Sequence, residues 1–575
     1  MYKANIKPFF LLALALLLKL HPSQITSEFK RLTMNLQKAA QLFQNGKLNE
    51  AAGLCESLLK TNQKDVQALH LRGVIAYQEK SYLKATEYLS QALELAPNNL
   101  DIKHALAASY YNVKFFKKSI ILYNEICNST AEVSNFIQLA DVYAANQEFE
   151  QAISVLAKAS KLAPKNVDVL FNLSRFYYHE KNYNATISQL NHLITIDCYH
   201  VNAWNLLGLT QSKLQDYSNA EVSFKRAIHI DSNYSPAYLN LASLLQELGK
   251  YEEALSNYIK AIDINKNSSA SFPEAYYNAA LIYLGNGDFH TGWENLKNRP
   301  KQFTDIPSLT DLEGKRILIV GEEGLGDELL FLRFLPELQK KNVTIAYKCN
   351  PKLNVLLQNH EAIDTLYNPG DDIPKYDFNI SAMDLPIILN IDNPKSVKPL
   401  KLSYQSYNSI PILSDLPQKQ ILGITWRAGV SNEETTANKY LEKSIPLSII
   451  GDILKDFEGT IIILQRNPSE KEVNFIKSNT KAEVIDASKL NNNLDEMLSC
   501  LDLIDNYIGV SNTNMHLYAS LNKNACVLIP YPGEWRWLYA GESSPWYPNF
   551  QLIRQEEFSN WETLRLQAKN YIDSL

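Results

Sequence analysis

Apolar and small residues recur with a period of about 34 positions through the first half of the chain. Within residues 201–234, Leu207, Gly208, Ala220 and Phe224 stand at positions 7, 8, 20 and 24 of one such unit. Two antiparallel helices per unit explain the pattern, because small residues let helices approach and large residues fill the remaining space. A single unit cannot bury its apolar face alone, so the pattern predicts about eight stacked units over residues 34–298. The units begin at Leu32, Val66, Leu100, Val133, Val167, Val201, Ser235 and Pro273.

This spacing resembles the tetratricopeptide repeat (TPR) family, which implies an α-solenoid with a concave face that binds a protein or peptide. Ser119 and Thr186 replace the small alanine expected at position 20, but the flanking register predicts that their units remain in the stack. Asn172, Asn205 and Asn240 lie near one repeat position. They form either a ladder that grips a peptide backbone or ordinary solvated surface.

After Pro307 the periodicity changes, and short β-rich apolar runs alternate with helical segments. Residues 316–320 read as a buried strand, followed by a glycine-rich turn and a helix, which is the opening of a Rossmann-like unit. Further strands are predicted at 343–347, 377–380, 421–427, 460–465, 482–486, 505–510 and 525–530, with a terminal helix from about Trp561. We therefore expect an α plus α/β chain, with a solenoid followed by two Rossmann-like lobes over 312–412 and 420–575.

The order of several motifs in this half adds a second resemblance. The motifs are Gly324-Leu325-Gly326-Asp327-Glu328, Gly423 to Arg427, Lys443-Ser444, Leu464-Gln465-Arg466, Ser511 to His516, and Trp535-Arg536-Trp537 followed by 544–548. In this order they resemble the bacterial TPR-containing glycosyltransferases, whose catalytic half is similar to heptosyltransferases and, distantly, to protein O-linked N-acetylglucosamine transferases. The resemblance implies a GT-B fold and inverting transfer from a nucleotide-sugar held mainly by the C-terminal lobe, without an obligatory metal or other cofactor.

The resemblance gives Asp327 the role of the base that deprotonates the acceptor hydroxyl, and a helix N-cap is its alternative role. His516 would stabilise the diphosphate or the ribose, or else be a satisfied buried histidine. No D-x-D triplet occurs in the sequence, so positive side chains and helix N-termini would neutralise the leaving diphosphate. The candidate donor-binding residues are Gly324, Gly326, Trp426, Arg427, Lys443, Gln465, Arg466, Ser511, Asn512, Thr513 and Asn514.

Some of these positions have competing interpretations. Arg427 and Lys443 are alternatively exposed solvated charges, and the 535–537 tripeptide is expected to pack between the lobes. Many relatives place an aspartate and a threonine where this chain has Ser511 and Asn512, which leaves both the donor preference and the activity open. The glycine turn lacks a strict G-x-G-x-x-G and is followed by no Lys-Ser/Thr pair, so a nucleotide enzyme of another class is not favoured.

Two functions therefore stand against each other. The first is a glycosyltransferase that modifies a protein or cell-surface acceptor chosen by the repeats. The second is a non-catalytic interaction scaffold whose transferase-like half is degenerate. A net charge of -6 indicates neither a nucleic-acid binder nor a membrane binder.

The six cysteines include no C-x-x-C pair, which favours buried thiols in a reducing compartment over a zinc or disulfide framework. Lys3 and Lys7 precede an apolar run over 9–18, which resembles a short signal sequence but is too short for a standard membrane helix. Alternatively, translation begins at Met34 and residues 1–33 are a mis-assigned start. We expect a cytoplasmic protein, or an anchored or exported one if the run is real.

Overall fold

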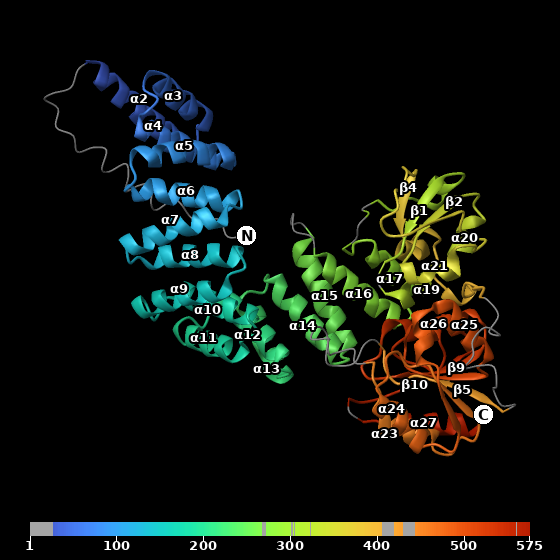
Figure 1. Cartoon of the computed structure of the whole chain (residues 1–575). Coiled ribbons are helices and arrows are strands. Elements are labelled where there is room, and N and C mark those ends of the chain that lie inside the picture. Colours follow the sequence, from blue (N-terminus) through green and yellow to red (C-terminus); the bar gives the residue numbers. More distant parts are fainter. Residues whose placement is uncertain are drawn as a thin grey trace. The chain divides into compact units, whose positions relative to one another are not determined.

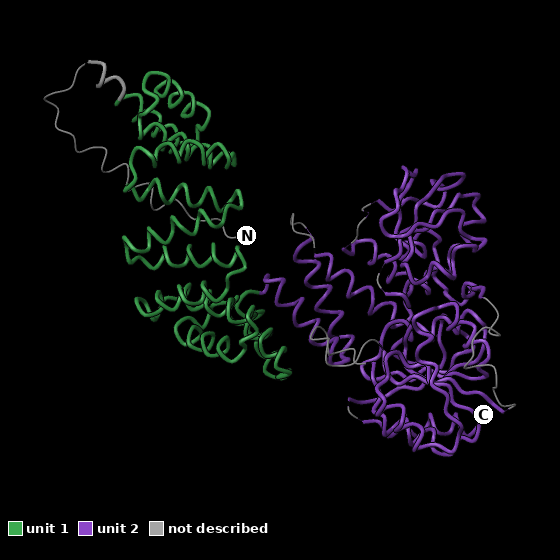
Figure 2. Tube along the Cα trace, viewed as in Figure 1, with its two compact units in different colours: residues 1–231 green, residues 232–575 purple. Residues whose placement is uncertain are grey.

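The computed structural model describes residues 27–266, 272–300, 303, 305–322, 324–404, 419–428, 443–558 and 560–575. It divides into two compact units, Met1–Asp231 and Ser232–Leu575, which are described separately below (Figure 2). The apolar run at 9–18 lies outside the described residues. Within the described residues, no helix is long and apolar enough to cross a membrane.

The first unit consists of consecutive antiparallel helix pairs that stack in chain order (Figure 1). Its helices are α2 (Ser27–Gln44), α3 (Leu48–Thr61), α4 (Val66–Gln78), α5 (Tyr82–Leu95), α6 (Leu100–Asn112), α7 (Phe116–Ser129), α8 (Val133–Ala145), α9 (Phe149–Leu162), α10 (Val167–His179), α11 (Tyr183–Ile196), α12 (Val201–Lys213) and α13 (Tyr217–Ile230). The predicted TPR solenoid is confirmed.

The small residues act as the periodicity predicts. Gly208 of α12 lies against Phe224 of α13, where an added Cβ would come within 2.6 Å of the ring. Ser119 and Thr186 are fully buried in their units, as expected from the register. Each hydroxyl donates to a backbone carbonyl, Ser119 at 2.8 Å and Thr186 at 3.0 Å, so neither polar group is left unsatisfied.

The second unit begins with two further antiparallel helix pairs, over residues 235–296, and continues into two sheets with their own helices. The helices are α14 (Ser235–Glu247), α15 (Tyr251–Asn265), α16 (Pro273–Gly285), α17 (Phe289–Leu296), α18 (Leu309–Leu312), α19 (Leu325–Leu332), α20 (Leu335–Gln339), α21 (Asn354–Leu357), α22 (Leu385–Ile388), α23 (Leu447–Leu454), α24 (Glu470–Ser478), α25 (Leu494–Leu503), α26 (Thr513–Ser520) and α27 (Glu562–Asp573). The strands are β1 (Arg316–Val320), β2 (Thr344–Lys348), β3 (Thr365–Tyr367), β4 (Phe378–Ser381), β5 (Ile421–Ile424), β6 (Thr460–Ile463), β7 (Glu483–Asp486), β8 (Asn506–Gly509), β9 (Asn524–Ile529) and β10 (Phe550–Arg554).

Both sheets are wholly parallel in their described strands. The first has the order β3-β2-β1-β4, with Ile319 opposite both Tyr347 and Ile380. The second has the order β10-β9-β8-β5-β6-β7, with Gly423 opposite both Ile462 and Tyr507. Counted along this lobe, the second order reads 6-5-4-1-2-3, which is the doubly wound Rossmann order. The predicted parallel sheets are confirmed.

A segment between β9 and β10, residues 531–547, packs against the last helices of the array, and we call it the docking segment. The Tyr531 hydroxyl donates to the Leu248 carbonyl at 2.9 Å, and Tyr251 stacks on Tyr539 with ring centroids 3.5 Å apart. Gly285 accommodates Tyr539, whose ring would lie 2.2 Å from a Cβ at that glycine. The last repeats and the second lobe are therefore built as one body.

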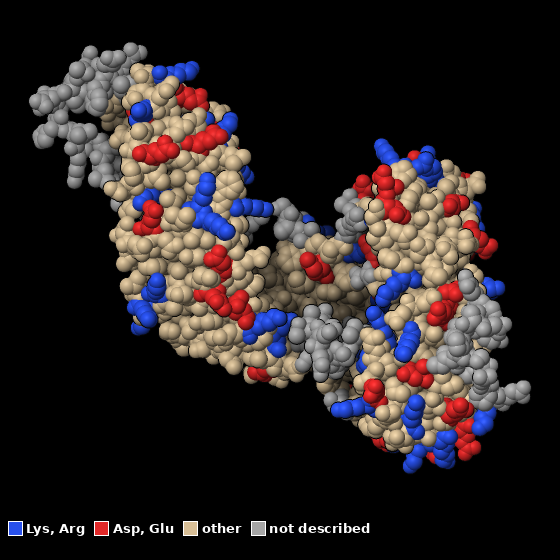
Figure 3. Space-filling model, in the orientation of Figure 1, with Lys and Arg blue, Asp and Glu red and all other residues tan. Residues whose placement is uncertain are grey.

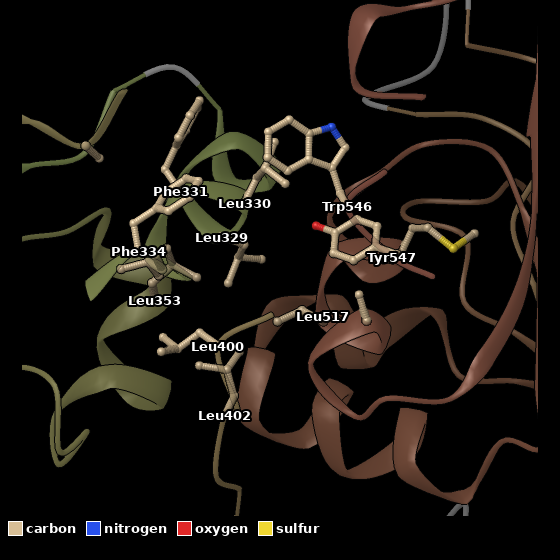
Figure 4. Close-up of a cluster of buried hydrophobic side chains, with 14 of the residues drawn as sticks. Leu329, Leu330, Phe331, Phe334, Leu353, Leu400, Leu402, Leu517, Trp546 and Tyr547 are labelled. Atoms are coloured by element: carbon tan, nitrogen blue, oxygen red, sulfur yellow. The ribbon is translucent and has the colours of Figure 1, made fainter. Parts of the chain in front are cut away.

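One hydrophobic cluster continues this packing through both lobes. It joins Trp293 of α17 to Phe331 and Trp546. In Figure 4, leucine and phenylalanine side chains of α19 and the following turn lie opposite Leu517 of α26 and the Trp546–Tyr547 pair. The 535–537 tripeptide was expected to pack, and its two tryptophans are indeed part of this cluster. The six cysteines are free thiols; of these, Cys55, Cys349, Cys500 and Cys526 are buried.

Candidate functional site

Four charged side chains meet between the two lobes, and we call them the inter-lobe charge cluster: Asp327, Lys443, Glu534 and Arg536. Arg536 forms an ion pair with Asp327, and its Nη1 lies 3.0 Å from a Glu534 oxygen. Lys443 Nζ lies 2.8 Å from the same carboxylate. Asp327 belongs to the first lobe and the other three belong to the second, so the cluster bridges them.

Glu534 is the most enclosed member of the cluster. Its carboxylate accepts hydrogen bonds from the Trp537 indole at 2.9 Å and from the Ser511 side chain. Burial alone would raise the pKa of Glu534, but the positive charges of Lys443 and Arg536 outweigh it and lower the pKa to about 2. In the cluster two cations therefore pair with two carboxylates, and they hold Glu534 ionised.

His516 lies beside this cluster on α26. Its ring stacks near Trp537 at 5.9 Å between centroids, and Nδ1 lies 2.7 Å from the Tyr547 hydroxyl. Burial lowers the pKa of His516 to about 3, against the opposing attraction of Asp327. The ring is thus a neutral hydrogen-bonding group, whose edge faces Gly326: a Cβ there would lie 3.1 Å from Nε2.

Asp327 is not the N-cap of α19, because Gly324 occupies that position and the aspartate sits in the first turn. The N-cap alternative is therefore wrong. Both hydrogen bonds from Arg536 go to Asp327 Oδ1. Among the described residues, none forms a hydrogen bond with Oδ2.

The ends of β5 and β8 meet at the point where the strand order of the second sheet reverses. Asn512 caps α26 by accepting from the Met515 N–H, and its amide donates to Thr425 Oγ1 at 2.8 Å. The Tyr507 hydroxyl bonds to both of these side chains, at 3.2 Å to Asn512 and 3.0 Å to Thr425. Asn512 is thus a structural link between the two strands, and Ser511 beside it turns towards Glu534.

The guanidinium of Arg427 pairs outside the inter-lobe charge cluster, although its backbone lies beside that of Ser444. It is nearly buried and pairs with Glu472 at 3.2 Å, and its Nη2 donates to the Asn467 carbonyl at 2.8 Å. It is therefore not the exposed charge of the alternative interpretation. Trp426 also donates to Glu472, at 2.9 Å. Gln465 accepts from the backbone N–H groups of residues 426 and 427, so these three predicted donor residues brace the loop after β5.

Of the remaining predicted donor residues, Asn514 has a structural role, whereas Thr513 and Arg466 are at least partly exposed. Asn514 is buried and donates to the Leu464 carbonyl and to Asn491, so it joins α26 to neighbouring loops. Thr513 is the first residue of α26 and is half-buried. Arg466 is exposed, and its carbonyl accepts from Arg427.

The sequence analysis did not predict that some charged residues belong to the site. Arg536 was expected only to pack, and Glu534 was not singled out, although charges placed among tryptophans need partners. A second buried group, Arg299, pairs with Asp384 at 2.6 Å and Glu322 at 2.8 Å, at the carboxyl ends of β4 and β1. No sequence motif indicated that the end of the array would reach the first sheet.

The asparagines near one repeat position differ in their exposure and hydrogen bonds. Asn172 donates to the Asp168 carbonyl at 2.9 Å and accepts from Arg175 at 2.8 Å. Asn205 is buried, so it is not solvated surface. On the face shown in Figure 3, both signs of charge are interspersed over each unit. Within the described residues, no group of three or more His, Cys, Asp or Glu side chains is placed to hold a metal ion.

Tetratricopeptide repeat family models match residues 36–99, 137–190, 201–234 and 235–268. Together with the stacked helix pairs, these matches establish a TPR-containing protein. Among the curated proteins, Protein FlbA of Caulobacter vibrioides is 23% identical over an alignment of 403 positions that covers 62% of this chain and 65% of FlbA.

Two further relatives match at similar identity. Anaphase-promoting complex subunit 3 of Schizosaccharomyces pombe is 22% identical, over 60% of this chain and 50% of the relative. The peroxisomal targeting signal receptor of Candida albicans is 22% identical, over 39% of this chain and 40% of the receptor. The chain thus spans less than two thirds of the length of each of these relatives.

Similar solved structures cover less than half of this chain. The crystal structure of MamA is 26% identical and covers 28% of this chain and 91% of its own, with a TM-score of 0.26. A TPR protein from Parabacteroides merdae is 14% identical and covers 44% and 99%, with a TM-score of 0.37.

The free energy of unfolding of the second unit is expected to fall as the pH drops below about 6.5, the usual value for histidine. In the unfolded chain His516 binds a proton at its usual pKa near 6.5, whereas in the folded chain its pKa is about 3. The contribution of His516 to stability is therefore fully present above about pH 6.5 and is lost as the pH falls from 6.5 towards 3. The loss approaches about 1.4 kcal/mol per pH unit. Glu534 adds a loss of the same sign between 4.5 and about 2.

Urea unfolding followed by tryptophan fluorescence at about pH 7 and about pH 5 measures this difference. Trp204 is the one tryptophan outside the second unit, so the signal reports mainly that unit. His516→Gln is expected to reduce the difference between the two pH values. A difference that stays as large in the variant contradicts the assignment.

Proposed function

We propose that the repeats bind a protein partner, and this is the function that the described geometry supports best. The supporting observation is a row of interacting side chains across successive first helices of the repeats. Asp141 of α8 and Arg175 of α10 are near enough to Tyr111 of α6 for their charges to act on its pKa, which Asp141 raises and Arg175 lowers, and Arg175 also lowers the pKa of Asp141. Tyr111 is 39% exposed and Arg175 is exposed, so the row offers aromatic, acidic and basic groups together.

The relatives support the same proposal by their names. One is named as a subunit of a protein complex and another as a receptor for a targeting signal. A TPR array that presents a mixed polar and aromatic row suits an extended polypeptide, because such a chain carries both backbone amides and side chains.

The double substitution Tyr111→Ala with Arg175→Ala is expected to abolish partner capture, because it removes both exposed ends of the row. The measurement is quantitative mass spectrometry of proteins retained by the immobilised full chain. Lys84→Ala with Lys117→Ala, on the second helices of their units, is the matched control and should retain the partner. Equal retention by all three proteins would argue against this surface.

The order of the second sheet favours a second candidate function, transfer of a sugar from a nucleotide-sugar. In doubly wound sheets, ligands bind beyond the carboxyl ends of the strands where the order reverses. Here that point lies between β5 and β8, where Ser511 and the N-terminus of α26 stand beside Lys443 and Glu534. A helix N-terminus favours phosphate oxygens, and the nearby cations would stabilise a leaving diphosphate.

Asp327 has a geometry that suits its proposed role as the base. Arg536 occupies Oδ1 alone, which leaves Oδ2 to receive the proton of an acceptor hydroxyl. Arg536 and Lys443 already pair with the carboxylates of Asp327 and Glu534. A bound diphosphate would therefore compete with these carboxylates for the two cations, and no unpaired cation of the cluster would be left to replace a missing one. Donor binding should therefore depend strongly on each cation.

One family of UDP-, GDP-, ADP- or CMP-sugars is expected to raise the melting temperature of the full chain by several degrees. Binding at about 100 times Kd adds about 2.7 kcal/mol to the stability of the folded state. The shift should be lost in Lys443→Ala and retained in Lys471→Ala, a lysine exposed on α24. Asp327→Asn should retain the shift and lower transfer by about 10²–10⁴-fold.

The scaffold alternative makes the opposite prediction. A well-folded chain that no nucleotide-sugar stabilises, but that still captures a partner through the Tyr111 row, would be an interaction protein with an inactive second half. A shift by every nucleotide regardless of the sugar would instead indicate a nucleotide enzyme of another class.

A further inference from the structure

The bond between Tyr547 and His516 has a direction that its surroundings determine. The hydroxyl and Nδ1 are 2.7 Å apart, and both side chains are buried. Either the tyrosine donates to Nδ1, or a protonated Nδ1 donates to the tyrosine oxygen. The two cases leave the imidazole proton on opposite ring nitrogens.

A buried positive charge lies on the other side of Tyr547. Arg333 is 2% exposed, and its guanidinium carbon lies 4.8 Å from the Tyr547 ring centroid and 5.4 Å from that of Trp546. Its Nη1 donates to the Trp546 carbonyl at 2.8 Å and its Nε to the Leu330 carbonyl at 3.0 Å. Within the described part of the chain, no carboxylate lies within ion-pair distance of Arg333, and a guanidinium can neither accept a hydrogen bond nor lose its charge.

The charge orients the hydroxyl. A side-chain hydrogen bond joins Arg333 to the Tyr547 hydroxyl. A guanidinium can only donate, so the hydroxyl oxygen accepts from it and the hydroxyl proton is left to point towards His516. Nδ1 is the only acceptor that the described residues offer to this proton. If Nδ1 itself carried a proton, the buried hydroxyl proton would be left without an acceptor among the described residues, which is unfavourable.

We propose that Arg333 and Tyr547 are positioning residues that hold His516 as the neutral Nε2–H tautomer, so that His516 serves the donor site as a hydrogen-bond donor and not as a base. This inference rests on the proposed transferase function for the identity of the ligand. No described residue forms a hydrogen bond with Nε2, which lies at the edge of the ring facing Gly326 and next to Asp327. The acceptor that matches it is a phosphate or sugar oxygen of a nucleotide-sugar.

The tautomer can be measured directly, without any ligand. Nitrogen-15 NMR of the full chain labelled at its 10 histidines separates pyrrole-type from pyridine-type ring nitrogens. His516→Gln assigns the signal by its loss. Near neutral pH, the expected pattern is a protonated Nε2 with a bare Nδ1. A protonated Nδ1, or a doubly protonated ring, would overturn the proposal.

Two substitutions test the positioning role itself. Tyr547→Phe keeps the ring and removes the hydroxyl, and Arg333→Met keeps the hydroxyl and removes the charge. Each is expected to lose the single-tautomer pattern, with the Nδ1–H form appearing. Tyr571→Phe, which removes another partly buried hydroxyl that bonds to Asn506, should leave the pattern unchanged. A pure Nε2–H ring in both Tyr547→Phe and Arg333→Met would show that these residues do not fix the tautomer.

The outcome is independent of the proposed function. A fixed Nε2–H tautomer in a chain that no nucleotide-sugar stabilises would reject the transferase proposal and leave the positioning role standing. A melting temperature raised by a nucleotide-sugar, together with a protonated Nδ1, would support the transferase proposal and reject the positioning role.

Discussion

The packing of the docking segment against the last repeats is the constraint on which the second unit depends. Two glycines make it sterically feasible: a Cβ at Gly249 would lie 2.0 Å from the Tyr531 hydroxyl, and one at Gly285 would lie 2.2 Å from the Tyr539 ring. The Tyr539 N–H then donates to the Gly285 carbonyl at 2.8 Å, so the segment is fixed by both backbone and side-chain contacts. Because a backbone hydrogen bond takes part, the position of the segment is tied to the backbone of α16 and not only to side-chain rotamers.

The same segment supplies two of the four members of the inter-lobe charge cluster and the tyrosine that contacts His516. Glu534 and Arg536 complete the inter-lobe charge cluster, and Tyr547 orients His516. Its apolar residues close the core between the lobes, since Trp546 contacts both Phe289 of α17 and Trp535. A substitution in the last repeats can therefore alter the electrostatics of the site without touching it. This arrangement gives the repeats a structural role in the site in addition to the binding role proposed for the first unit.

The sequence predicted the array well because close helix packing imposes a strict register of small residues, as at Gly208. The turn at position 15 of the units is visible in the sequence only where a glycine stands there, as at Gly46, Gly249 and Gly287. Lys80, Lys114 and Gln147 adopt the same positive φ at that position without a glycine's freedom. For the site, the sequence motifs singled out Asp327, Lys443, Ser511 and His516, and the structure places all four in or beside the inter-lobe charge cluster. The catalytic and donor-binding roles of these residues stay predictions. Arg427 directly follows a buried strand, a place where a phosphate-binding side chain is expected, but it pairs with Glu472. No pattern in a single sequence reveals an ion-pair partner that lies so far along the chain.

Native-state hydrogen exchange of the full chain tests most directly whether the last repeats and the two lobes form one cooperative unit. The account predicts that peptides from α14, α16 and α17 exchange together with β8 and β9, and more slowly than those from α4 to α11. It also predicts that Tyr539→Ala accelerates exchange in α16 and in the docking segment while leaving α4 to α11 unchanged. Exchange of α14 to α17 at the rates of the first unit, with no response to Tyr539→Ala, would contradict it.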